Sequence, residues 1–116
     1  VVASDVDEKG LQGTVQEAGP LCHQFRADAS NEADVANLFS SARSAMGGYN
    51  VLVNNAGILR DSLLVKKDKE TGFGVRGMSL TDWNDVLRVH LTGSFLCARE
   101  SSLPMNPAEN SRAHKN

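Results

Sequence analysis

The stretch Val51-Leu52-Val53-Asn54-Asn55-Ala56-Gly57-Ile58 decides how the rest of the chain is interpreted. Its first three residues are apolar and two of them are β-branched, which is typical of a buried strand. The run then stops at two asparagines, an alanine and a glycine. Small residues at the end of a strand let a ligand approach the backbone closely. We therefore predict a strand over Tyr49–Val53 whose carboxyl end carries a binding segment.

The predicted elements around this stretch alternate between strand and helix. Their ranges are, in order, strand 1–4, helix 8–17, strand 21–25, helix 31–46, strand 49–53 and a long helix 82–103. That order implies a parallel sheet with helices on its faces, joined by right-handed crossovers. In such sheets ligands bind beyond the carboxyl ends of the strands. The residues of interest are therefore those where strands stop, at Asp5, Asp28 and Asn54–Gly57.

Two segments have a different composition. Lys66–Gly77 is rich in charged residues and glycine, so we expect an exposed excursion, a solvated insertion rather than a substrate lid. Ser101–Asn116 holds two prolines and has almost no apolar periodicity. We expect this tail to be irregular and disordered.

Composition argues against several classes of function. The 12 basic and 14 acidic residues among 116 give a net charge of −2, without the basic excess of a nucleic-acid-binding protein. No run approaches the roughly 20 apolar residues that span a bilayer. Cys22 and Cys97 match no metal or redox spacing. We expect no nucleic-acid or membrane partner, no metal site and a cytoplasmic location.

At the strand ends the chain resembles the short-chain dehydrogenase/reductase family, in the subgroup of bacterial 3-oxoacyl-acyl-carrier-protein reductases. The matching stretches are Ser4-Asp5-Val6, Ala27-Asp28-Ala29, Val51–Ile58, Arg60-Asp61 with Leu63-Leu64, and Trp83–Phe95. The resemblance implies an α/β fold with a Rossmann-type doubly wound parallel sheet. Residues 1–100 would form a partial dinucleotide-binding domain that supplies strands two to four and the long helix after strand four, without the first strand and the C-terminal half.

The resemblance implies NAD as the cofactor, with NADP as the alternative. Asp5, with Val6 beside it, ends a strand where a carboxylate can accept two hydrogen bonds from a ribose diol and would repel a 2′-phosphate. The alternative is a solvated loop carboxylate or a helix cap, for which Asp7 is better placed. Asp28 and Ala29 would meet the amino edge and the ring of adenine, unless Asp28 is an ordinary loop aspartate.

The segment after the third strand is also assigned through the resemblance. Asn55, Ala56 and Gly57 would lie against the adenosine ribose. His90 stands where the family has an asparagine that holds a helix kink and a water of the proton relay. Histidine offers one donor and one acceptor, so a substitute catalytic role is implied; the alternative is a half-buried helix histidine. Gly93 costs a helix about 1 kcal/mol against alanine, which fits a kink or a close approach there.

The implied activity is that of an NAD(P)-dependent oxidoreductase moving a hydride between nicotinamide and a carbonyl or alcohol substrate of the 3-oxoacyl type, in a homotetramer when intact. The family's Tyr-x-x-x-Lys pair is missing, because the single tyrosine, Tyr49, has Val53 rather than lysine four residues later. The family's catalytic serine is missing as well. Gly10 and Gly13 do not follow a strand directly, so they cannot form the glycine-rich phosphate turn. We expect this chain alone to be inactive and to bind dinucleotide weakly or not at all.

Two other functions fit part of the pattern. A non-enzymatic interaction module would dock on an intact relative through helix 82–103, the element that resembles the subunit-pairing helix of the family. A complete flavodoxin-like domain binding a mononucleotide is the third reading, and the missing phosphate loop argues against it.

Overall fold

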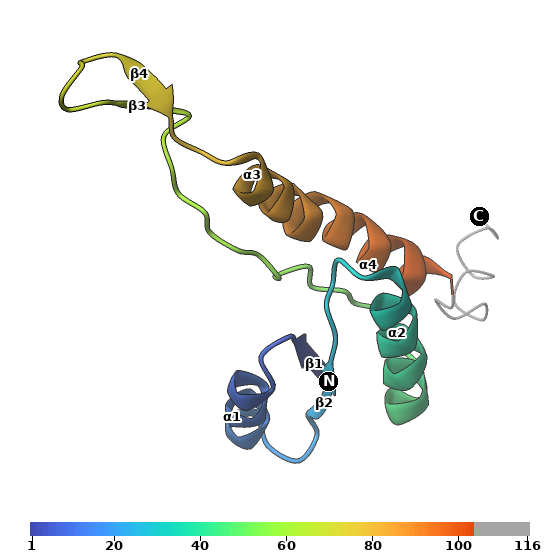
Figure 1. Cartoon of the computed structure of the whole chain (residues 1–116). Helices are drawn as coiled ribbons and strands as arrows, with labels where there is room; N and C mark the ends of the chain where they lie inside the picture. Colours follow the sequence, from blue (N-terminus) through green and yellow to red (C-terminus); the bar gives the residue numbers. More distant parts are fainter. Residues whose placement is uncertain (104–116) are drawn as a thin grey trace, which may run out of the picture.

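The computed structural model describes residues 1–103, which form two small sheets and a series of helices (Figure 1). The elements are β1 (Val2–Asp5), α1 (Glu8–Ala18), β2 (His23–Arg26), α2 (Glu32–Met46), β3 (Val65–Lys67), β4 (Gly74–Arg76), α3 (Leu80–Leu87), the π-helical segment η1 (Arg88–Gly93) and α4 (Ser94–Ser102). Ser101 and Ser102, which the sequence assigned to the irregular tail, belong to α4 instead. The rest of that prediction, residues 104–116, lies outside the described residues.

The first three elements form the predicted strand–helix–strand unit. β1 and β2 are parallel, with Val2 opposite His23 and Asp5 opposite Arg26. Asp7 begins α1, since its carboxylate accepts a hydrogen bond from the Lys9 amide at 3.1 Å and satisfies one of the amides that a helix start leaves unpaired. Asp7 is thus the helix cap, as the sequence indicated. The unit brings the ends of both strands to the same edge of the sheet.

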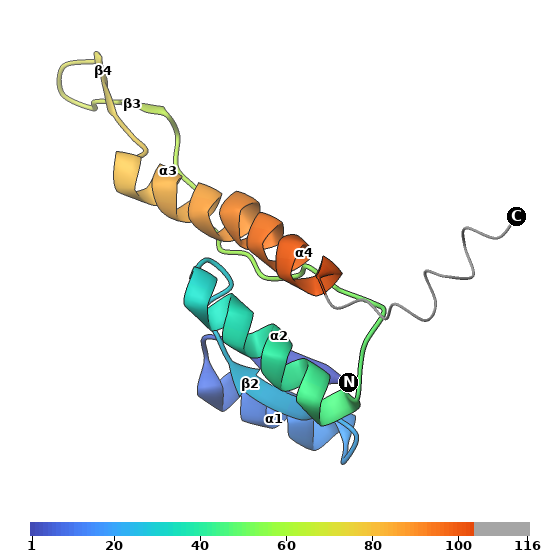
Figure 2. The ribbon, with the colours of Figure 1, turned by 90° about the vertical axis from the view of Figure 1, so that its right-hand side faces the viewer.

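The second helix covers the other side of this strand pair. Asn31 caps α2 by accepting a hydrogen bond from the Asp34 amide at 3.0 Å, and the helix ends at Gly47 in the left-handed conformation. The apolar face of α2 places Val35, which is fully buried, against Leu96 and Cys97 of α4. Figure 2 shows the resulting order, with β1 and β2 between α1 and α2, and α4 against α2.

The third predicted strand, Tyr49–Val53, does not form. No helix or strand is assigned between residues 47 and 64, and the side chains of Val51 and Val53 are 76% and 77% exposed. A strand needs a neighbouring backbone to accept and donate its ladder hydrogen bonds. Among residues 1–103, β1 pairs with β2 alone, and no strand lies between β1 and segment 49–53 to supply that ladder. The prediction of a buried strand over Tyr49–Val53 is therefore wrong for this structure, because residues 1–103 offer that segment no ladder partner.

The charged segment Lys66–Gly77 is exposed, as expected, but it is an ordered hairpin rather than an irregular loop. β3 and β4 are antiparallel, with Val65 opposite Arg76. The Asp68 carboxylate closes the turn by accepting hydrogen bonds from the amides of Glu70 and Thr71 and from the Thr71 hydroxyl. These bonds hold the pKa of Asp68 below its ordinary value. Figure 1 shows the hairpin projecting away from β1 and β2.

The long helix begins two residues earlier than predicted and changes its winding in the middle. Ser79 caps α3 by accepting a hydrogen bond from the Asp82 amide at 3.0 Å. The π-helical segment η1 contains both His90 and Gly93, the two residues at which the sequence indicated a kink. Gly93 is buried, and a Cβ atom added there would lie 3.2 Å from the carbonyl oxygen of Ala29. The expected close approach is therefore present, and its partner is the loop after β2.

The outer face of this helix is apolar and exposed. Trp83, Leu87 and Phe95 are 49%, 38% and 58% exposed. Leu80 and Leu91 lie on the same face at three- and four-residue steps and are 73% and 67% exposed. We call these five residues the outer stripe. No element within residues 1–103 covers it.

Gly93 provides a test of this packing. We expect Gly93→Val to lower the free energy of unfolding by about 1–3 kcal/mol, because the added side chain meets the backbone of Ala29 in a closely packed position. Gly13→Val is the matched control in α1, since nothing lies within 4 Å of a Cβ atom added at Gly13; its effect should stay within about 0.5 kcal/mol. Urea denaturation followed by circular dichroism measures both. Equal effects would contradict the close approach.

Candidate functional site

The ends of both parallel strands border one cavity of about 650 Å³. The other walls are formed by segment 48–58, by the inner side of α2 and by the turn from η1 into α4. All seven residues that the sequence assigned to a cofactor line this cavity: Asp5, Val6, Asp28, Ala29, Asn55, Ala56 and Gly57. The structure thus brings together three segments that are far apart in the sequence. Their role in binding stays a prediction.

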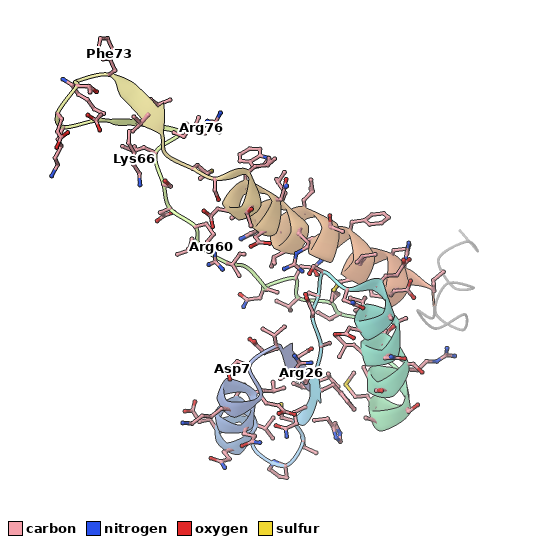
Figure 3. The ribbon with its side chains drawn as sticks, in the orientation of Figure 1. Asp7, Arg26, Arg60, Lys66, Phe73 and Arg76 are labelled. Carbon is pink, nitrogen blue, oxygen red and sulfur yellow. The ribbon has the colours of Figure 1, made fainter. Side chains whose placement is uncertain are left out.

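Asp5 stands at the carboxyl end of β1. Its Oδ1 accepts a hydrogen bond from the Asp7 amide at 2.9 Å, which holds the turn between β1 and α1. Figure 3 shows Asp7 at the start of α1 and Arg26 at the end of β2. The other carboxylate oxygen of Asp5 accepts no hydrogen bond from residues 1–103, and the residue is exposed at the cavity edge. One oxygen is therefore available to a ligand.

Asp28 follows β2 and is held more firmly. Its Oδ1 accepts hydrogen bonds from the Ser30 amide at 2.9 Å and from the Ser30 hydroxyl at 2.5 Å. Its Oδ2 lies 3.2 Å from Nη1 of Arg88 in η1. The pKa of Asp28 is lowered, chiefly by the Ser30 hydroxyl and against the effect of partial burial, with Arg88 contributing further. Asp28 is therefore an ionised acceptor at neutral pH.

His90 contacts the segment that follows the predicted third strand. Its Nε2 lies 2.9 Å from the carbonyl oxygen and 3.0 Å from the amide nitrogen of Ile58. One ring nitrogen either donates to that oxygen or accepts from that amide, so the tautomer decides which bond forms. A Cβ atom added at Gly57 would lie 2.6 Å from Cε1 of His90. The glycine therefore makes room for the imidazole ring.

Two residues of the site were not singled out from the sequence. Ser30 stands two residues after Asp28, and this Asp-x-Ser spacing is typical of a side chain that closes its own turn, so the signal was available. Arg88 lies 60 residues from Asp28, and nothing in a single sequence pairs the two. Ser30 and Arg88 each donate a hydrogen bond to the Asp28 carboxylate.

The described residues 1–103 meet the requirements of neither a metal site nor a membrane-spanning helix, and their cysteines and tyrosine are packed within the fold. No cluster of three or more His, Cys, Asp or Glu side chains is placed to hold a metal ion within that range. None of the helices described there is long and apolar enough to cross a membrane. Both cysteines are free and buried, and burial raises the pKa of Cys97. Tyr49 packs against Phe39 with ring centroids 5.7 Å apart.

Comparisons with known proteins agree with the strand-end pattern. A family model described as enoyl-(acyl carrier protein) reductase matches residues 1–112. Nodulation protein G of Rhizobium sp. (strain N33) is 37% identical over 95 residues, which are 82% of this chain and 34% of that protein. The 3-oxoacyl-[acyl-carrier-protein] reductase FabG of Aquifex aeolicus is 35% identical over 83 residues, 72% of this chain and 29% of that protein. The chain spans about a third of the length of these relatives.

Solved structures show the same fold. The 3-ketoacyl-(acyl-carrier-protein) reductase of Brucella melitensis, complexed with NADH, superposes with a TM-score of 0.77 at 26% identity, over 97% of this chain and 42% of that one. A short-chain dehydrogenase/reductase of Burkholderia phymatum, in complex with NAD, has a TM-score of 0.73 at 33% identity, over 90% and 34%. These likenesses confirm the Rossmann-type α/β fold class. The chain belongs to the short-chain dehydrogenase/reductase family and resembles its 3-oxoacyl-acyl-carrier-protein reductases.

Proposed function

We propose that this chain supplies the adenosine-binding part of an NAD-dependent oxidoreductase that reduces a 3-oxoacyl or related carbonyl substrate. The observation that carries the proposal is the meeting, on one cavity, of all seven residues that the sequence assigned to the cofactor. Two relatives of known structure are complexed with NADH or NAD, which favours a nicotinamide dinucleotide. When bound, that cofactor supplies the hydride. The protein in which the chain acts would be a homotetramer in the cytoplasm.

The polar rim of the cavity fits the adenosine end. The free oxygen of Asp5 can accept from a ribose hydroxyl, and its negative charge would repel a 2′-phosphate. Asp28 is an ionised acceptor for an amino group of the base. Asn55, Ala56 and Gly57 present short side chains, so a sugar can approach their backbone. Volumes of 300–1,000 Å³ are ordinary for small-molecule sites, and the cavity lies within that range at about 650 Å³.

Hydride transfer needs groups that residues 1–103 do not place at this cavity. Tyr49 lines it, but Val53 rather than a lysine stands four residues on, and the Tyr49 hydroxyl is buried without a hydrogen-bond partner in the described range. Burial raises the pKa of Tyr49, which disfavours the phenolate that general acid/base chemistry would use. We therefore expect this chain alone to be inactive. Oxidation of NADH in the presence of a 3-oxoacyl thioester, above a control without protein, would contradict this. Because the seven assigned residues meet on one cavity, we expect weak binding of dinucleotide rather than none, so the titrations below need high ligand concentrations.

In the family, an asparagine at the position of His90 holds a helix kink and a water of the proton relay. His90 would perform the first of these two functions, holding the local structure of the helix. Its ring bonds the Ile58 backbone directly, next to the segment assigned to the ribose. An imidazole that donates or accepts at Nε2 leaves Nδ1 with the opposite property, so a water could be held there in the complete enzyme. This arrangement supports the substitute role that the sequence indicated for His90.

An interaction module is the second candidate function. The outer stripe of α3, η1 and α4 is an apolar face that no other element within residues 1–103 covers. Contiguous exposed apolar surface marks interaction sites more often than isolated exposed residues do. The partner would be an intact relative, paired through the same helix.

The NAD preference tests the main proposal. We expect Asp5→Asn to improve binding of NADP relative to NAD by roughly five- to tenfold, because it removes the charge that opposes the 2′-phosphate. Glu17→Gln, which removes an acidic group of α1 that does not line the cavity, is the matched control and should leave the ratio unchanged. Both affinities are obtained by titration followed by backbone amide shifts. An unaltered ratio in Asp5→Asn would rule out the assigned role of Asp5.

The outer stripe tests the second candidate. If the chain docks on a full-length relative through this helix, Leu91→Lys should abolish co-purification with that relative, because it places a charge in the centre of the stripe. Leu21→Lys is the control, since Leu21 is 82% exposed but lies between α1 and β2. Capture that survives Leu91→Lys, or a chain that is never captured, would exclude docking through this face.

A further inference from the structure

Arg88 joins two parts of the site that the sequence does not connect. It is the first residue of η1, and its Nη1 donates to Oδ2 of Asp28 and to the hydroxyl of Ser30. Its Nε lies 3.8 Å from the Asp85 carboxylate, one turn earlier in the helix. The guanidinium thus bridges the helix and the loop that follows β2. Exposed ion pairs add little stability, so this contact acts chiefly on the geometry of Asp28.

The bonds around Asp28 fix the direction of its carboxylate. Oδ1 receives both the amide and the hydroxyl of Ser30, while Oδ2 receives Arg88. A carboxylate offers about four lone-pair sites, so one site stays open on Oδ2. The planar carboxylate turns as a unit about its terminal torsion, which is soft. Ser30 holds it at Oδ1, and a contact at Oδ2 adds a second point that limits this rotation. Arg88 supplies the contact that holds Oδ2 in place.

A fixed anionic acceptor selects what can lie opposite it. An exocyclic amino group on a purine donates a hydrogen bond to such an acceptor. A carbonyl oxygen in the same place would face it with lone pairs, and the half-buried acceptor would lose a partner. Because Asp28 and Ala29 line the cavity, this selection between an amino group and a carbonyl oxygen acts on the base of a bound nucleotide.

We infer that Arg88 is a positioning residue that makes the base end of the site selective for purines carrying an exocyclic amino group. The inference rests on the proposed function, because it places the base at Asp28. It adds a residue to the site that neither the strand-end pattern nor the resemblance indicated. Arg88 acts through Asp28 and does not itself touch the base.

The test compares NAD with nicotinamide hypoxanthine dinucleotide, in which a carbonyl replaces the amino group. Binding of each to the chain is followed by the amide shifts of Ala29–Asn31. We expect the unsubstituted chain to prefer NAD by about tenfold, the difference typical of one hydrogen bond to a charged group. Arg88→Gln should reduce the preference to about twofold or less. Arg88→Lys should restore part of it, since lysine keeps a donor and the charge.

Arg60→Gln is the matched control. It breaks an ion pair of similar exposure, with Nε of Arg60 3.7 Å from Asp82 Oδ1. Arg60 lies beside α3 and does not line this cavity (Figure 3). Its preference for NAD should equal that of the unsubstituted chain. A loss of preference in Arg60→Gln would mean that any weakened ion pair has this effect, and the inference would be wrong.

A ligand-free measurement separates this inference from the proposed function. The carboxyl carbon of Asp28 should titrate at higher pH in Arg88→Gln, because a contact that lowers the pKa is lost. If that rise is seen and NAD binds, but the NAD preference is unchanged, the inference fails and the proposed function stands. If no dinucleotide shifts these amides in the unsubstituted chain, the proposed function fails and the inference falls with it. An unchanged titration of Asp28 would itself contradict the Arg88 contact.

Discussion

The site depends on the contacts that the π-helical turn η1 makes with two segments, the loop after β2 and the irregular stretch 49–58. At one end of η1, Gly93 lies so close to the Ala29 carbonyl that a side chain would have to displace backbone. In the middle, His90 bonds the backbone of Ile58. At the other end, Arg88 reaches Asp28. Segments from β2 and from the irregular stretch 49–58 meet because one helix touches both.

The wide winding of η1 has a physical role in this arrangement. π-helical turns are rare and occur often at functional sites, where they redirect side chains that a regular helix would place elsewhere. Here the turn spans Arg88–Gly93. It contains Arg88, which bonds Asp28, His90, which bonds Ile58, and Gly93, which approaches Ala29. Gly93 and Gly57 both lack the side chain that would prevent the approach. The helix, rather than a third strand, holds the far wall of the cavity in place.

Local signals in the sequence predicted the helices well. The caps Asp7 and Asn31 follow from side-chain chemistry within a few residues, which a single sequence contains. The glycine at position 93 indicated a close approach, but its partner Ala29 could not be read from the sequence. The errors concern contacts between distant residues. Segment 49–53 has the composition of a strand but no ladder partner, and the hairpin of β3 and β4 depends on a cross-strand register that charge and glycine content do not encode. The ion pair of Arg88 with Asp28 also joins distant residues, 60 positions apart, and was not predicted.

The central claim is that the strand-end residues of this chain hold the adenosine end of NAD(H). The most direct measurement is a titration of the chain with NADH, followed by all backbone amide resonances. The account predicts shifts concentrated at the ends of β1 and β2 and over 55–58, with α1 and the hairpin of β3 and β4 unaffected. No shifts at saturating concentrations, or shifts centred on the hairpin or the outer stripe, would contradict it.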